Sequence, residues 1–139
     1  MQFEIYSNIN NQMKNLRDLV FIQEQGCTLA EEYEDDETKF LHLCGSVEGQ
    51  IIVYARILIE NITAFIDRVA ILKEYRGCGY GNTIMDFAEK EATTRGCIKV
   101  ELHAQTQASV FYSKRGYYAE GDEFLEDNKT AIFIINKNP

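Results

Sequence analysis

Proline is nearly absent from this sequence: the single proline is the last residue, Pro139. No internal repeat, low-complexity tract or linker-like stretch occurs either, so residues 1–139 are expected to form a single domain with its own core. The four cysteines form no Cys-x-x-Cys pair and the two histidines complete no finger spacing, which argues against a metal site. No apolar run reaches the roughly 18 residues that a membrane-spanning helix needs.

Positive charge is also scarce. Lysine and arginine total 14 against 22 aspartates and glutamates, which gives a net charge of −8 at pH 7. This balance argues against nucleic acid or an anionic membrane as the main partner. The N-terminus lacks a basic region followed by an apolar one, so no secretory signal is expected. The expected location is therefore the cytoplasm, where thiols stay reduced.

Two common nucleotide-binding signatures are missing as well. A P-loop requires a Gly-Lys pair, and the sequence has none. The dinucleotide fingerprint Gly-x-Gly-x-x-Gly fails in both registers, because its last position falls on Asn82 or Ile84.

The most informative stretch that is present is Arg76-Gly-Cys-Gly-Tyr-Gly81, which follows a strand-like run at 65–72 and opens a helix-like run at 82–95. Its glycines let the backbone turn tightly and let a ligand approach. The unpaired N–H groups of the helix that follows attract anions, and Arg76 adds a positive charge suited to phosphate. The stretch predicts a loop for a phosphorylated cofactor, and the alternative is a glycine-rich turn without a ligand. Cys78 is interpreted as a small residue tolerated there, with chemical modification as the alternative.

Alternation and periodicity predict the other elements. An amphipathic helix is expected at 8–25, ended by Gly26, and a short helix at 107–114. Strands are expected at 1–6, 39–46, 50–59, 63–72, 97–104, 117–120 and 130–135. Together these elements predict a mixed α/β sheet with the order β-α-α-β-β-β-α-β-α-β-β.

Two blocks carry a family resemblance. Arg76, Gly79 and Gly81 meet the pattern Arg/Gln-x-x-Gly-x-Gly/Ala, and the run Phe-Tyr-Ser-Lys-Arg-Gly-Tyr follows at 111–117. In this order and spacing they resemble the GNAT superfamily of N-acetyltransferases. The resemblance implies a GNAT-like α/β (α+β) fold, with a mixed, mostly antiparallel central sheet of about six to seven strands flanked by about four helices.

A narrower likeness covers most of the chain. The segments 21–26, 31–37, 102–105 and 124–127 resemble the ElaA/YjcF-like subgroup of acetyltransferases. One position departs from it, because this chain has Thr130-Ala131 where the subgroup commonly has a Pro-His pair. Any role that this histidine has in the subgroup is therefore absent from this chain or is performed by another residue.

The resemblance implies an enzyme that moves the acetyl group of acetyl-CoA directly to a primary amine of a small molecule or a protein, without a metal. Main-chain groups of Val69, Ala70 and Ile71 would pair with the pantetheine of coenzyme A. The pyrophosphate would be held by the amides of Arg76, Gly77, Cys78, Gly79, Tyr80, Gly81 and Asn82. Tyr112 is the candidate acid for the thiolate, since a phenol pKa of about 10 is close to that of a thiol. Its other interpretation is an ordinary buried aromatic.

The general base is less defined. His103 lies near the end of a strand and has a suitable intrinsic pKa, but a lone histidine is often structural. Glu24 is a comparable candidate, Glu123 and Glu126 are weaker ones, and a chain of water molecules is a further alternative. Arg56 and Arg68 are expected to pair with carboxylates as structural residues.

The acidic run Glu31–Glu37 has two interpretations: a solvated segment, or a lid that attracts a cationic amine. Two functions other than catalysis also stay open. One is a catalytically weak acyl-CoA-binding regulatory or sensor module, and the other is a protein-interaction domain that has lost the cofactor. A homodimer is a further expectation, since dimers are common in the superfamily.

Overall fold

The computed structural model describes residues 1–126 and 130–138. Its helices and strands follow the order expected from the sequence. They are β1 (Gln2–Tyr6), α1 (Asn11–Arg17), the π-helix η1 (Asp18–Glu24), α2 (Leu29–Glu32), β2 (Leu41–Val47), β3 (Gln50–Glu60), β4 (Thr63–Ile71), α3 (Tyr80–Thr94), β5 (Lys99–Gln105), α4 (Ser109–Lys114), β6 (Tyr118–Glu126) and β7 (Thr130–Lys137). Short 3-10 turns lie at Glu37–Lys39, Lys73–Tyr75 and Thr106–Ala108.

Two elements differ from the expectation. The helix predicted at 8–25 begins only at Asn11, because the side chain of Asn10 caps it by accepting from the Met13 N–H at 2.9 Å. It continues past Arg17 as the wider η1, which periodicity does not reveal. Strand β6 extends to Glu126 instead of ending at residue 120, with a register irregularity after Glu120.

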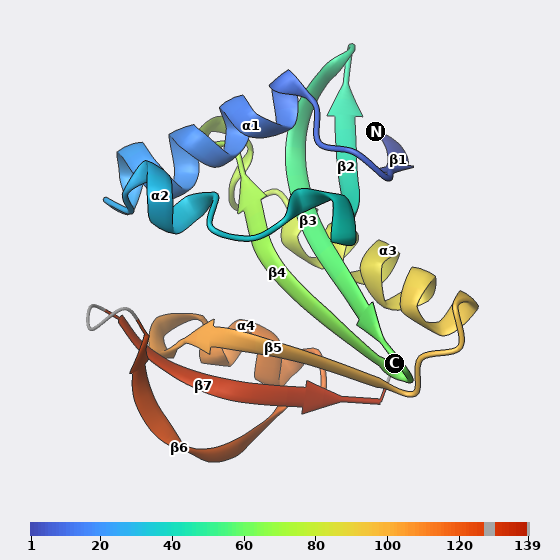
Figure 1. Cartoon of the computed structure of the whole chain (residues 1–139), viewed down its shortest axis with the longest axis vertical. Coiled ribbons are helices and arrows are strands. Elements are labelled where there is room, and N and C mark those ends of the chain that lie inside the picture. Colours follow the sequence, from blue (N-terminus) through green and yellow to red (C-terminus); the bar gives the residue numbers. More distant parts are fainter. Residues whose placement is uncertain (127–129, 139) are drawn as a thin grey trace.

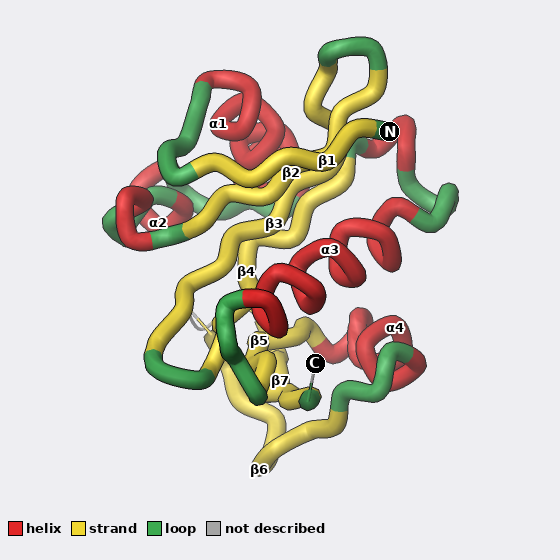
Figure 2. The backbone as a smooth tube through the Cα atoms, turned by 90° about the vertical axis from the view of Figure 1, so that its right-hand side faces the viewer, coloured by secondary structure: helices red, strands yellow, loops and turns green. Residues whose placement is uncertain are grey.

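All the strands that the structure describes form one sheet, in the order β1-β2-β3-β4-β5-β7-β6. Every neighbouring pair is antiparallel except β4 and β5, which are parallel. Helices α1 and α2 lie on one face of the sheet, and α3 and α4 lie on the other (Figure 2). This is the mixed, mostly antiparallel architecture that the resemblance implied.

Strands β4 and β5 separate soon after they begin. They pair only where Thr63–Phe65 lie beside Lys99–Glu101, and then they diverge toward their C-terminal ends (Figure 1). The edge of β4 that faces β5 therefore lacks a ladder partner from residue 66 onward among the described residues. A sheet edge of this kind presents N–H and C=O groups to any extended chain that enters.

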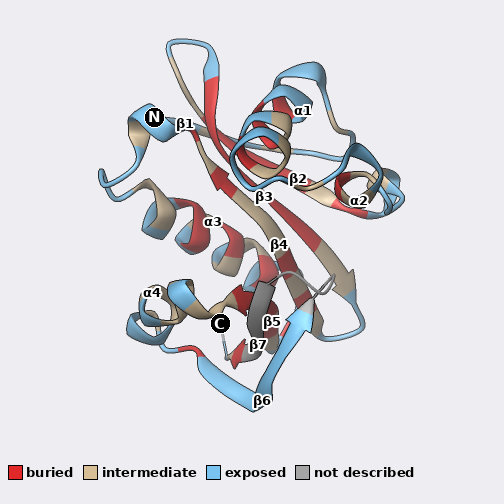
Figure 3. Cartoon of the chain, turned by 90° about the vertical axis from the view of Figure 1, so that its left-hand side faces the viewer, coloured by how far each residue is buried: buried red, intermediate tan, exposed pale blue. Residues whose placement is uncertain are grey.

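The core lies mainly against β2 and β3, which have the largest buried share among the described strands, and it continues onto β4 and β5 (Figure 3). Side chains of α1 fill it from one face and those of α3 from the other; Met13, Leu16, Ile84 and Met85 are all at most 2% exposed. Described residues of β6 are exposed up to residue 125. The separated end of β4 thus belongs to the same continuous sheet as the buried strands β2 and β3.

Candidate active site

A cleft of about 910 Å³ opens where β4 and β5 diverge. One wall comes from η1, α2 and the segment after them, and the other comes from β5, the 3-10 turn Thr106–Ala108 and Tyr112 of α4. The cleft is lined by Phe21, Gln25, Cys27, Glu31, Glu32, Asp35, Phe40, Leu58, Phe65, Ile66, Asp67, Arg68, Val69, Glu101, Leu102, His103, Ala104, Gln105, Gln107, Ala108 and Tyr112. Five carboxylates and one arginine belong to this lining, and arginines bind three of those carboxylates: Glu32, Asp35 and Asp67.

A bulge in β4 shapes the floor of the cleft. The register with β3 shifts between Tyr54 and Arg56, and Arg68 adopts a φ of 52°. This left-handed conformation is unusual for a residue other than glycine and is costly in a strand. The bulge brings two consecutive residues to the α1–α2 side: Asp67 binds Arg56, and Arg68 forms an ion pair with Glu32 at 2.9 Å.

Arg17 is fully buried beneath the acidic segment. Its Nε donates to the carboxylate of Glu32 at 2.6 Å, its Nη1 to the carboxylate of Glu37 at 2.8 Å, and its Nη2 to the main-chain carbonyl of Glu32 at 2.9 Å. The guanidinium also lies 4.7 Å from the centre of the Tyr33 ring. Burial raises the pKa of Glu32, while Arg17 and its neighbours oppose that rise.

Arg56 makes a second set of buried ion pairs. It binds Asp67 through two nitrogens at 2.8 and 2.7 Å, and it reaches Glu37 and Asp35 at 3.0 Å each. The interpretation of residues 31–37 as a simply solvated run is therefore wrong, because Glu32 is 1% exposed and three of the acidic side chains bind arginines. Ion pairs with Arg17 and Arg56 instead hold the segment 31–37 in place at the cleft. The expected structural pairing of Arg56 and Arg68 with carboxylates is confirmed.

His42 is fully buried beside these arginines. Its Nδ1 lies 2.6 Å from the Tyr54 hydroxyl, and its Nε2 lies 2.9 Å from the main-chain carbonyl of Glu37. A neutral ring that donates from Nε2 and accepts at Nδ1 satisfies both contacts. Burial lowers the pKa of His42, and the nearby charges of Arg17 and Arg56 lower it further.

From the burial of His42 we predict that the free energy of unfolding of the protein falls in mild acid. The folded-state pKa of His42 lies below the unfolded value of about 6.5, so the unfolded chain binds a proton at this residue before the folded protein does. The contribution of His42 to the free energy of unfolding is therefore complete above a pH of about 6.5 and is lost as the pH falls below it. Urea unfolding between pH 7.5 and 5.5 should show that the free energy of unfolding falls with the pH. The part of this fall that His42 causes is at most about 1.4 kcal/mol per pH unit. His42→Gln should flatten the decline. His103→Gln, at an exposed position, should keep it, and equal slopes in all three proteins would contradict the assignment.

The glycine loop stands at the C-terminal end of β4. Gly77 and Gly79 have φ values of 75° and 87°, so both need the conformational freedom that glycine provides. Gly79 is the N-cap of α3, and no side chain in the described structure caps that helix. The first N–H groups of a 15-residue helix are therefore presented to solvent beside the open edge of β4. Cys78 is exposed within this loop.

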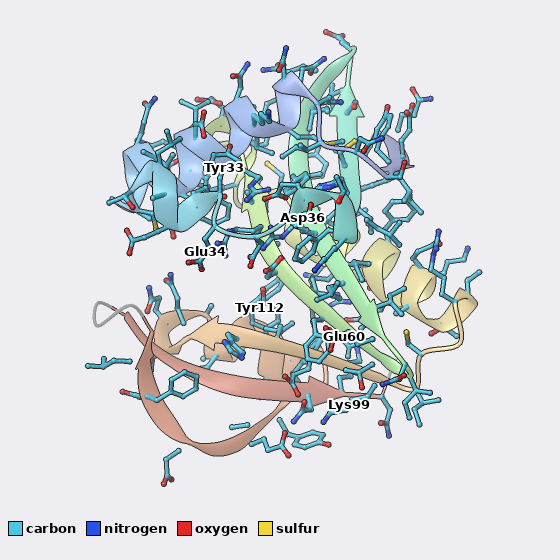
Figure 4. All side chains as sticks on the ribbon, in the orientation of Figure 1. Tyr33, Glu34, Asp36, Glu60, Lys99 and Tyr112 are labelled. Atoms are coloured by element: carbon cyan, nitrogen blue, oxygen red, sulfur yellow. The ribbon has the colours of Figure 1, made fainter. Side chains whose placement is uncertain are left out.

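Tyr112 lies in the gap between β4 and β5 (Figure 4). Its ring packs edge-to-face on Phe111 and Tyr117, with centroids 4.9 and 5.5 Å away. Burial raises the pKa of Tyr112 to about 12, so the hydroxyl keeps its proton at neutral pH. His103 lines the same cleft from β5, with its ring edge-on to Phe124 at 5.8 Å. The fold thus brings Tyr112, His103 and Val69 to one cleft.

Glu24 lies elsewhere. It is absent from the cleft lining, and both of its carboxylate oxygens accept from Arg76, at 2.7 and 2.8 Å. Hydrogen bonding to Arg76 lowers the pKa of Glu24, which makes it a weak base. Glu123 is exposed and lies 3.4 Å from the Thr106 hydroxyl. The side chains of Glu126 and Ala131 lie outside the described residues.

Sequence reasoning missed part of the cleft. Phe21, Gln25 and Cys27 line it from the end of η1, and Phe40 supports it beneath the Arg56 guanidinium, 3.7 Å from the ring centre. Phe21 and Gln25 belong to the segment 21–26 that carries the subgroup likeness, but no local pattern gives them a role, because they share a cleft with β5 only through the tertiary structure. Within the described ranges, no cluster of three or more His, Cys, Asp or Glu is arranged to hold a metal, and no helix is long and apolar enough to cross a membrane.

Comparison with known proteins gives consistent matches. The family model described as acetyltransferase (GNAT) domain matches residues 18–132. The uncharacterized N-acetyltransferase YjcF of Bacillus subtilis (strain 168) is 32% identical over 112 residues, which are 80% of this chain and 80% of YjcF. The crystal structure of Escherichia coli ElaA superposes with a TM-score of 0.85 at 21% identity, covering 99% of each chain. An aminoglycoside 6'-N-acetyltransferase complexed with coenzyme A superposes with a TM-score of 0.80 at 14% identity, covering 99% of this chain and 97% of the other.

Proposed function

Because the chain belongs to the acetyltransferase (GNAT) domain family, we propose that it transfers the acetyl group of acetyl-CoA directly to a primary amine, with Tyr112 as the acid for the departing thiolate. The observation that carries this proposal is the separation of β4 from β5. It leaves an open strand edge that leads from the uncapped N-terminus of α3 to Tyr112.

The coenzyme fits this geometry as an added strand. An extended pantetheine can pair with main-chain groups of Val69, Ala70 and Ile71, whose β5-facing edge has no strand partner in the described structure, although the Ile71 carbonyl accepts from Arg76. Its pyrophosphate matches the amides of residues 76–82, where the φ values of Gly77 and Gly79 shape the loop. The complex of the aminoglycoside acetyltransferase with coenzyme A supports this assignment by analogy of fold.

The chemistry requires proton transfers to the thiolate and from the amine. The amine nitrogen forms a bond to the acetyl carbon, the carbon–sulfur bond breaks, and the thiolate takes the Tyr112 proton. A cationic amine must first lose one proton to become the neutral nucleophile, and His103, which shares the cleft with Tyr112, is our candidate to accept it directly or through water. The nitrogen loses a second proton after the bond to the acetyl carbon forms, and this proton balances the one that Tyr112 gave to the thiolate. Glu24 is bound to Arg76 outside the cleft and does not suit this role.

The acceptor is proposed to be a cationic amine. Glu31 and Glu101 line the cleft in addition to the arginine-bound carboxylates, and the labelled Glu34 projects from the acidic segment above the gap (Figure 4). A polyamine, an amino sugar and a lysine side chain all have suitable charge. A cytoplasmic location and a homodimer stay predictions.

Calorimetric titration with acetyl-CoA tests the proposal. The wild type should bind with micromolar affinity, and Gly79→Val should weaken binding at least about tenfold, because a side chain at φ 87° distorts the loop and fills the phosphate approach. Gly96→Val is the matched control, since Gly96 has φ 86°, equally open surroundings and a position at the far end of α3. Absence of binding by folded wild type would refute the function; binding justifies an amine-library screen for thiol release.

A further inference from the structure

The side chain of Arg76, at the start of the glycine loop, makes several hydrogen bonds. Its Nε donates to the main-chain carbonyl of Ile71 at 3.0 Å, and its two terminal nitrogens donate to Glu24 at 2.7 and 2.8 Å. The guanidinium therefore joins the glycine loop, the end of β4 and the last residue of η1. Bidentate carboxylate binding fixes the plane of an arginine as well as its position.

The carbonyl that Arg76 binds belongs to the open edge of β4. The N–H of Leu72 donates to Ile52 of β3 at 2.9 Å. In a trans peptide the C=O points away from the N–H, so the Ile71 carbonyl faces away from β3, toward the gap. Arg76 thus covers the last carbonyl of the edge that the proposed function assigns to pantetheine.

We propose that Glu24 is a positioning residue that holds Arg76 and, through it, keeps the glycine loop and the end of β4 in the arrangement that receives coenzyme A. The proposal rests on the proposed function for the identity of the ligand. Gln25 and Cys27, which follow Glu24, line the cleft, so the same contact connects the cleft wall that begins with η1 to the glycine loop.

Positioning and simple electrostatics predict opposite effects. Coenzyme A is an anion, so removing a nearby carboxylate and releasing Arg76 would tighten binding if charge alone mattered. If Glu24 positions Arg76, the same change weakens binding, because the loop must be ordered when the coenzyme enters. The sign of the change therefore distinguishes the two.

The experiment compares Glu24→Ala, Glu24→Gln and Glu74→Gln by calorimetry with coenzyme A and by hydrogen exchange of the 76–82 amides without it. Glu74 is the matched control, because it lies two residues from Arg76 and forms no hydrogen bond or ion pair with it in the described structure. Glu24→Ala should raise the Kd about three- to fivefold and speed exchange in the loop, with a smaller effect for glutamine, which keeps one acceptor. Glu74→Gln should leave the Kd equal or lower.

A double-mutant cycle and a kinetic measurement complete the test. In an Arg76→Gln background, Glu24→Ala should have no further effect on the Kd. The KM for acetyl-CoA should rise in Glu24→Ala while kcat stays within about twofold, whereas loss of a catalytic base would lower kcat itself. An unchanged or lower Kd in Glu24→Ala with unchanged loop exchange would overturn the positioning role alone. A wild type that binds no coenzyme A would instead overturn the proposed function.

Discussion

Replacing Tyr112 with phenylalanine should lower kcat about a hundredfold and leave the Kd for acetyl-CoA within about twofold of the wild type. The ring keeps its packing against Phe111 and Tyr117, so only the hydroxyl proton is lost. The hydroxyl of Tyr112 keeps its proton at neutral pH and is available as a donor in every turnover, while burial raises its pKa to about 12 and so makes it a weaker acid toward the thiolate than an ordinary phenol. Steady-state kinetics by thiol release, together with calorimetry, would measure both quantities.

Tyr117→Phe is the matched control for this experiment. Its hydroxyl donates to Glu89 at 2.8 Å, and the residue is absent from the cleft lining, so kcat should be nearly unchanged. Retention of more than half of the wild-type kcat by Tyr112→Phe would show that another donor protonates the thiolate. A wild type that binds the coenzyme but transfers no acetyl group to any amine would favour the sensor module.

Arg17→Met should destabilise the domain by about 3–5 kcal/mol. Methionine keeps an apolar stem, but the change removes the hydrogen bonds that satisfy the carboxylate and carbonyl of Glu32, which is 1% exposed. A buried carboxylate left with a poorer set of partners is costly, and Arg68 alone does not replace a donor at 2.6 Å. Urea unfolding at pH 7.5 would measure the loss.

Arg95→Met provides the comparison for that measurement. Arg95 pairs with Glu91 one helical turn away on the surface, and such pairs contribute about 0.3–0.5 kcal/mol. The two substitutions remove the same charge, so their difference reports burial. A loss below about 1 kcal/mol for Arg17→Met would mean that the acidic segment is not fastened by this arginine.

The sequence alone determined the order of the elements and the family. Each of these predictions depends on residues that lie close to one another in the chain: the alternation of the strands, the glycine loop and the run at 111–117. Short-range patterns of this kind can be recognised without knowledge of the tertiary structure. The need for glycine at 77 and 79 is likewise a property of a few backbone dihedrals. Tyr112 could be singled out for the same reason, since its motif is continuous.

Only the tertiary structure decided which charged residues meet. The acidic run 31–37 has the composition of a solvated segment, yet Arg17, Arg56 and Arg68 arrive from a helix and two strands and bind it. Glu24 and Arg76, 52 residues apart, are another such pair, which changes the role expected for both. Composition reports how many charges a chain has, but their effect depends on burial and on partners, and the packing of distant segments sets both.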